Sequence, residues 1–120
     1  MTDAEFEAQK ERVRPLIPKW AAALGLHEFE IKTVYERECD KECPSHIMSV
    51  DHNSSYLWAT VHVWTPQLLD MSDEDVEETV VHEMVHVFFG MMLRGNGHRE
   101  DAERCTVRLA RALMRLSKGA

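Results

Sequence analysis

The segment from Ser72 to about Leu93 constrains the fold most, because it predicts one long helix with an apolar side that must be covered. Ser72 is a suitable N-cap, and acidic residues occupy 73–75 in the first turn, where the helix dipole favours negative charge. The apolar stripe recurs at helical spacing and consists of Val76, Val80, Val81, Val85, Phe88 and Phe89. The rest of the chain must therefore supply a layer against which this helix packs.

The other patterns predict a helix, a few strands and a last helix. Residues 3–24 have helical spacing, and Pro15 is expected to divide them before Gly25 ends the segment. Alternation of apolar and polar residues predicts strands at about 28–35, 47–50 and, most clearly, 57–64. A turn at 94–97 precedes a helix over about 98–116. This order predicts an α+β fold with a small, mostly antiparallel sheet.

Length and charge predict a single soluble domain spanning residues 1–120. Hydrophobic residues make up 44% of the 120 residues and charged residues 29%, which is typical of a folded soluble domain. The formal net charge of -7 disfavours general nucleic-acid binding. The basic residues of the last helix are interpreted as its solvated face: Arg104, Arg108, Arg111, Arg115 and Lys118. The same helical wheel places Cys105 and Leu116 on the buried side.

The termini and the cysteines predict a cytoplasmic protein. No run is long and apolar enough to cross a membrane, and the sequence Thr2-Asp3-Ala4-Glu5 lacks the features of a signal peptide. The three cysteines are an odd number in no disulfide pattern, which favours a reducing compartment. The oligomeric state is left open.

The residues His82-Glu83-Met84-Val85-His86 form an H-E-x-x-H sequence on the predicted long helix. Residues four apart lie on one helix face, so His82 and His86 can bind one zinc ion, Zn2+. Glu83 is offset by about 100° and flanks the metal instead of binding it. There it is expected to accept a proton from a zinc-bound water, whose pKa the metal lowers to about 7. The pattern predicts a zinc-dependent hydrolase with Glu83 as the catalytic residue.

A third protein ligand is expected from the last helix, where the choices are His98, Glu100, Asp101 and Glu103. Two arguments favour Glu103. It projects toward the apolar side of the helix, where an unpaired carboxylate is costly and a metal would be a sufficient partner. It also lies about 9 Å below the predicted turn, level with His86 at about 10 Å. His98 would lie near the turn, far from the metal.

The chain resembles the gluzincin clan of zinc peptidases, and more closely the phage- and prophage-associated mini-gluzincins. The resemblance covers most of the chain and is carried by Trp20, Leu24-Gly25-Leu26, the 56–64 strand with Pro66, residues 78–86, and Glu103 ahead of residues 107–113. It implies a zincin-like fold with Glu103 as third ligand and a peptide or protein as substrate. It also implies an edge strand, expected at 57–64, that presents backbone groups to an extended peptide.

Two departures leave alternatives open. The acidic partner that large gluzincins carry four residues beyond the third ligand is replaced by Val107, and no oxyanion donor is evident, although Tyr56 and His98 are available. The Gly97-His98 pair is similar to the third-ligand context of Spartan-like zinc proteases, in which His98 would replace Glu103. The remaining alternative is a zinc-binding regulatory module without catalytic activity, although Glu83 would then be idle.

Cys39, Cys43 and His46 have metal-ligand types at tolerable spacing, with Asp51 or His52 available as a fourth ligand. A charged loop with free thiols is the favoured interpretation. Trp58 and Trp64 are expected either to line a cleft or to lie on an exposed strand face.

Overall fold

The computed structural model describes residues 1–92 and 99–119, with side chains left undescribed at 91, 92, 99–102 and 119. The helices are α1 (Asp3–Val13), α2 (Leu16–Ala23), α3 (Asp73–Met92) and α4 (Arg99–Gly119). The strands are β1 (Glu30–Glu36), β2 (Met48–Asn53) and β3 (Trp58–Trp64), and a short 3-10 helix, η1 (Thr65–Leu68), follows β3. The α+β order predicted from the sequence is confirmed. The turn expected at 94–97 lies outside the described residues.

Local signals set the ends of the helices as expected. Pro15 separates α1 from α2, and Gly25 has a φ of 71°. Its N–H bonds to the carbonyl of Ala22, while Leu26 N–H bonds to the carbonyl of Ala21. This pair of bonds is a Schellman cap, which needs the left-handed backbone that glycine adopts without strain. At the start of α3 the backbone N–H of Asp75 donates to Ser72 Oγ at 3.1 Å, so Ser72 is the N-cap.

The sheet is mixed, and the expectation of a mostly antiparallel sheet was wrong for one of its two pairings. The strand order is β1-β3-β2; β1 is parallel to β3, and β2 is antiparallel to β3. The loop 37–47 is long enough for β2 to lie one strand position away from β1, and β3 occupies the position between them. The 57–64 strand is therefore central and not an edge. It begins at Trp58 because Leu57 has a left-handed backbone (φ 57°).

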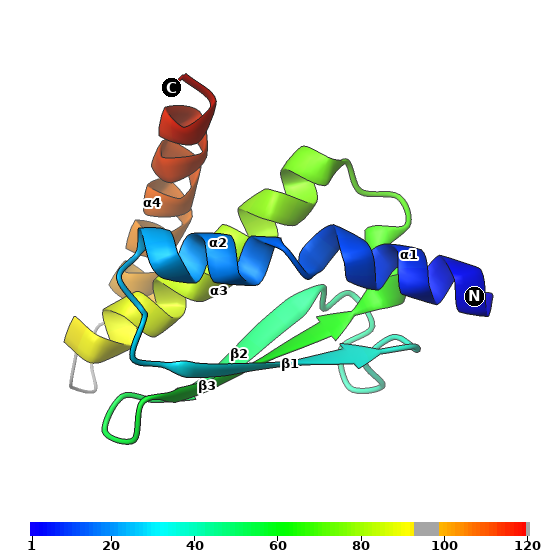
Figure 1. The fold of residues 1–120 in the computed structure, drawn as a ribbon, viewed down its shortest axis with the longest axis horizontal. Coiled ribbons are helices and arrows are strands. Elements are labelled where there is room, and N and C mark those ends of the chain that lie inside the picture. The colour runs from blue at the N-terminus through cyan, green and yellow to red at the C-terminus, as the bar shows by residue number, and fades with distance from the viewer. Residues whose placement is uncertain (93–98, 120) are drawn as a thin grey trace.

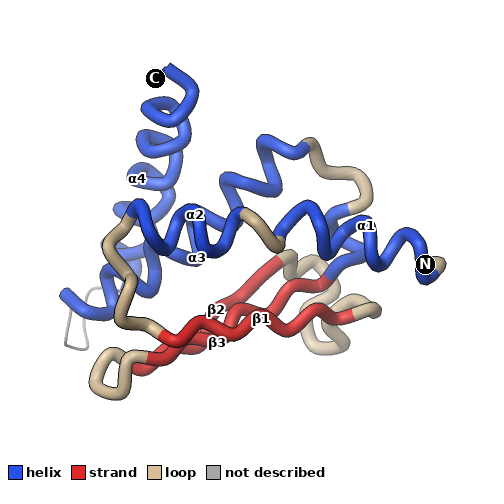
Figure 2. Tube along the Cα trace, in the orientation of Figure 1, coloured by secondary structure: helices blue, strands red, loops and turns tan. Residues whose placement is uncertain are grey.

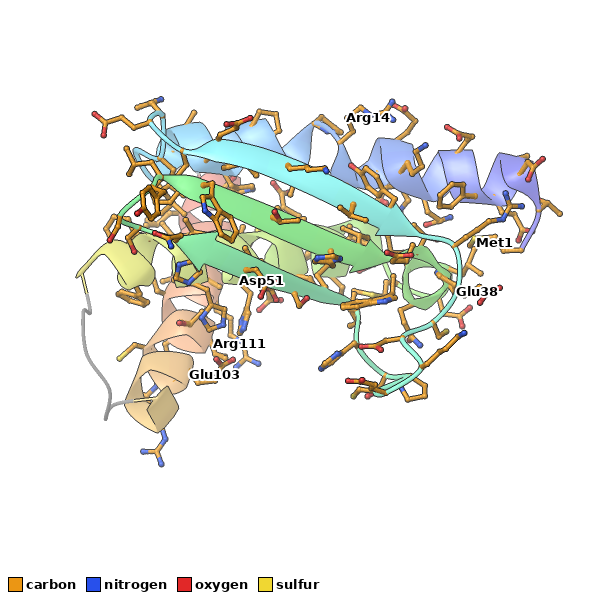
Figure 3. The ribbon with its side chains drawn as sticks, turned by 90° about the horizontal axis from the view of Figure 1, so that it is seen from below. Met1, Arg14, Glu38, Asp51, Glu103 and Arg111 are labelled. Atoms are coloured by element: carbon orange, nitrogen blue, oxygen red, sulfur yellow. The ribbon has the colours of Figure 1, made fainter. Side chains whose placement is uncertain are left out.

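Helices α1 to α4 lie on one side of the sheet, as Figure 1 and the tube in Figure 2 show. Ala59, Val61 and Val63 point from β3 into the layer between sheet and helices and are almost fully buried. Alternation turns Trp58, His62 and Trp64 to the opposite face, which no helix covers in Figure 3. The two tryptophans thus lie on an exposed strand face and line no cleft beneath α3.

The four helices share one apolar core with the sheet. From α3 it takes Val76, Val80, Val81, Met84, Val85 and Val87, all buried. Helix α4 contributes Ala110 and Met114, but its C-terminal end projects away from the body (Figure 1). The placement of Cys105 and Leu116 on a buried side was therefore wrong: Cys105 is exposed, and Leu116 is 70% exposed. No helix among the described residues is long and apolar enough to cross a membrane.

Candidate metal centre

Two helices bring three potential ligands together. His82 and His86 lie one turn apart on α3, and Glu103 lies on the facing first half of α4. The Nε2 atoms of the two histidines are 3.1 Å apart. Oε1 of Glu103 is 3.0 Å from Nε2 of His82, and Oε2 is 3.1 Å from Nε2 of His86. Side chains from separate helices thus point their coordinating atoms at one place.

The spacing of these atoms fits a small cation. A tetrahedral zinc site with ligand bonds of about 2.0–2.1 Å separates neighbouring ligand atoms by roughly 3.3 Å. The two Nε2 atoms are 3.1 Å apart, and each lies 3.0 to 3.1 Å from one of the two carboxylate oxygens of Glu103, which is close to that value. Two imidazoles and one carboxylate are also a donor set that zinc accepts. The residues present could hold a metal ion.

The electrostatics of His86 suit a ligand role. Burial lowers the pKa of His86, and the nearby His82 and His52 lower it further, while the carboxylate of Glu103 opposes them. A lowered pKa keeps the imidazole neutral, which is the form that binds metals. Both rings are partly accessible, with 25% of the His82 side chain and 29% of the His86 side chain exposed.

Glu83 lies beside the triangle in a different environment. It is buried on α3 with 8% of its surface exposed, and no basic side chain among the described residues pairs with it. Burial, together with the negative charge of Glu103, raises the pKa of Glu83 to about 8. A carboxyl group in such a place holds a proton near neutral pH, and a nearby divalent cation would favour its ionised form.

The position of Glu103 on its helix differs from the prediction that it lies on the apolar, buried side. Its side chain is 54% exposed, so the argument that a buried carboxylate needs a partner was wrong. The carboxylate of Glu103 nevertheless contacts both histidines across the helix pair. His98 lies outside the described residues, as do the side chains of Glu100 and Asp101.

The second group of potential ligands does not converge. Among the residues that the structure describes, the group with metal-binding spacing is His82, His86 and Glu103, and the loop cysteines do not form another. Cys39 accepts a hydrogen bond from Gln67, and His46 contacts Asp40 at 3.1 Å. His52 points elsewhere, toward α3.

His52 is the neighbour of the site that sequence reasoning missed. It lies on β2 opposite Ala59, so its side chain is on the helix side of the sheet, close enough to affect the pKa of His86. Its ring lies against Gly90, four residues beyond His86. The sequence feature that could have indicated this contact is Gly90, which continues the four-residue spacing of the histidines along the helix and leaves space for a side chain from another element.

Comparison with known proteins adds no family to this description. The chain matches no model of a known protein family, and no curated protein or solved structure matches it. The arrangement of the residues is therefore the basis for assigning a function.

Proposed function

We propose that this chain is a zinc-dependent hydrolase that cleaves peptide bonds in a peptide or protein substrate. The single observation that carries the proposal is the triangle of His82, His86 and Glu103, with a buried acid, Glu83, beside it. Structural zinc sites usually close with four protein ligands, whereas catalytic sites have three and keep one position open. Three converging ligands and an idle carboxyl group favour the catalytic type.

The chain's own residues supply the remaining chemistry. When bound, zinc would act as a Lewis acid that polarises the scissile carbonyl and lowers the pKa of a coordinated water. Glu83 takes the proton from the attacking water and later delivers it to the leaving amine, so that it is regenerated as the C–N bond breaks. Burial of Glu83 keeps most of its surface away from bulk water.

The sheet supports a peptide as the substrate. Within the described residues β2 is an edge strand of the sheet, and it lies next to α3, which carries the histidines (Figure 3). An edge strand offers unpaired backbone N–H and C=O groups with which an extended peptide can pair. In the proposal, β2 takes the substrate-pairing role that was expected of the 57–64 strand.

The resemblance to mini-gluzincins supports this proposal. Such enzymes use a glutamate of the following helix as the third ligand, and Glu103 is the matching residue here. The Spartan-like alternative would need His98 at the metal in place of Glu103. The third alternative, a zinc-binding regulatory module, would use the same triangle without turnover. Substitution of Glu83 distinguishes this last alternative from the enzyme, because only the enzyme needs the carboxyl group of Glu83.

The test combines zinc content with proteolysis. Untagged wild type and Glu83→Gln are loaded with zinc, and hydrolysis of casein is followed by mass spectrometry of the released peptides. We expect about one zinc per chain in both proteins and cleavage only by the wild type. Glu74→Gln is the matched control, since this acid lies on the first turn of the same helix with its side chain 62% exposed.

The outcomes separate the alternatives. Stoichiometric zinc in a wild type that cleaves no peptide would support the regulatory module and contradict the hydrolase. Equal cleavage by wild type and Glu83→Gln would remove Glu83 from the reaction. Loss of zinc from Glu83→Gln would show that this residue acts as a ligand.

A further inference from the structure

The row of residues 82, 86 and 90 runs along one face of α3, because each is four positions from the next. The first two positions are the histidines, and the third is a glycine inside the helix. Glycine weakens a helix interior relative to alanine, so its presence there needs a reason. The reason is the imidazole of His52, which fills the space that a side chain at position 90 would occupy.

The contact between His52 and Gly90 is specific. A Cβ at position 90 would lie 2.2 Å from Cε1 of the His52 ring, 2.8 Å from Nδ1 and 3.0 Å from Nε2. Ser54, two residues beyond His52, also contacts Gly90: its hydroxyl donates a hydrogen bond to the backbone carbonyl of Gly90 at 2.9 Å. The helix and the edge strand are thus fitted together around this ring, one turn beyond His86.

The polar atoms of the ring are not used by the fold. Nδ1 of His52 is buried, and within the described residues it has no hydrogen-bond partner. Because Nδ1 is closed off by the packing against Gly90, a bound ligand can reach the ring only at its other nitrogen, Nε2, which is not among the buried unpaired atoms. His52 is also not part of the ligand triangle, which leaves its ring free to bond to something else.

We propose that His52 donates the N–H at Nε2 to the carbonyl oxygen of the bound peptide and stabilises the negative charge that develops there as water attacks. The inference rests on the proposed function and adds the oxyanion donor that the sequence did not reveal. The donor comes from the edge strand that would pair with the substrate. It acts by a hydrogen bond and transfers no proton, so Glu83 remains the group that moves protons.

The test uses two zinc-binding ligands, of which only the first presents a charged oxygen that His52 could contact. The first is a phosphinic analogue of a peptide that the wild type cleaves, whose charged tetrahedral group resembles the attacked carbonyl. The second is a thiol-bearing analogue of the same peptide, which has no such oxygen. For zinc-loaded His52→Ala, calorimetry should show about 100-fold weaker binding of the phosphinic peptide and a change under about threefold for the thiol.

Two further variants make the result specific. His62→Ala on the neighbouring strand is the control, because this histidine faces the other side of the sheet and should bind both ligands like the wild type. His52→Gln keeps a side-chain N–H and should recover part of the lost affinity. Turnover should follow the same order, with the loss in kcat and little change in KM.

Gly90→Ala tests the fit between the two elements. The added methyl group must displace the His52 ring from between the helix and the strand, so thermal stability should fall, while zinc content should be maintained because neither residue belongs to the ligand triangle. Binding of the phosphinic peptide should fall as in His52→Ala. In the double variant the two losses should not add, because both substitutions remove the same hydrogen bond.

The possible failures are distinguishable. If the wild type cleaves peptides and His52→Ala binds the phosphinic ligand equally well, the oxyanion role is wrong and the hydrolase stands. If His52→Ala loses its zinc, His52 is a ligand and the donor role is wrong. If the wild type cleaves no peptide, the proposed function fails and this inference fails with it.

Discussion

Nε2 of His82 lies 3.0 Å from Oε1 of Glu103, which joins the long helix α3 to α4 at the candidate metal centre. The contact is also one edge of the triangle completed by His86. A metal bound here would cross-link two helices that otherwise meet through packing residues such as Ala110 and Met114. Removing one corner should therefore affect both metal affinity and the stability of the helix pair.

Glu103→Ala should bind zinc at least about 100-fold more weakly than the wild type. Loss of a residue that only hydrogen-bonds to a metal ligand already weakens metal binding by up to about 100-fold, and loss of a ligand should cost at least as much. The measurement is competition for zinc with a chromophoric chelator. Arg108→Ala, on an exposed position of the same helix, is the control and should bind zinc normally. If zinc is lost from His98→Ala and retained by Glu103→Ala, the Spartan-like ligand set replaces the one proposed here.

Zinc should raise the melting temperature of the wild type, because a ligand that binds only the folded state stabilises it. At a free zinc concentration 100 times Kd the gain is about 2.7 kcal/mol, or roughly 10 °C for a chain of this size. Addition of a chelator should reverse the shift in a thermal melt followed by circular dichroism. Zinc should raise the melting temperature of His86→Ala only slightly. An equal rise in that variant would argue against the site.

Glu77 should make folding stability depend on acidic pH. Its carboxylate accepts hydrogen bonds from Lys19 and from the indole of Trp20, both at 2.7 Å. Burial alone would raise the pKa of Glu77, but these bonds and the nearby positive charges together lower it. A lowered folded pKa gives stability that is present above the unfolded value, about 4.3, and is lost as pH falls through the folded value.

Glu77→Gln should therefore be less stable than the wild type at pH 7. The difference should shrink as the pH falls below about 4, because the wild-type carboxylate is then protonated as well. Urea denaturation of both proteins from pH 3 to pH 7 measures it. A difference that stays constant across this range would show that the charge of Glu77 contributes nothing.

Arg12 should be the most important basic residue for stability among those described here. Its guanidinium donates to the backbone carbonyls of Leu68 (2.7 Å) and Met71 (2.6 Å), and it pairs with Asp73 at 2.9 Å. These bonds tie α1 to the turn that starts α3. Arg12→Ala leaves partly buried carbonyls without a donor and should cost about 2–4 kcal/mol.

The control for Arg12 is its neighbour Arg14, which forms a surface ion pair with Glu11 and has 54% of its side chain exposed. Exposed pairs contribute about 0–1 kcal/mol, so Arg14→Ala should unfold nearly at the wild-type urea concentration. Equal losses in the two variants would mean that the carbonyl contacts of Arg12 do not stabilise the chain.

The elements that could be predicted from the sequence are those that depend on neighbours along the chain. Pro15 and Gly25 set the ends of α1 and α2, Ser72 caps α3, and alternation located the three strands. The errors concern partners that are distant in sequence. The parallel pairing of β1 with β3 and the exposure of Cys105 depend on how whole elements pack, which no local pattern contains.

The amino-acid sequence by itself determined that His82 and His86 share a face of α3, because a spacing of four residues has one geometric outcome in a helix. Only the tertiary structure decided that Glu103 meets them and that the ring of His52 occupies the space left by Gly90. Those contacts join different helices and strands, and they form only when the packing of the entire core determines how the elements lie against one another.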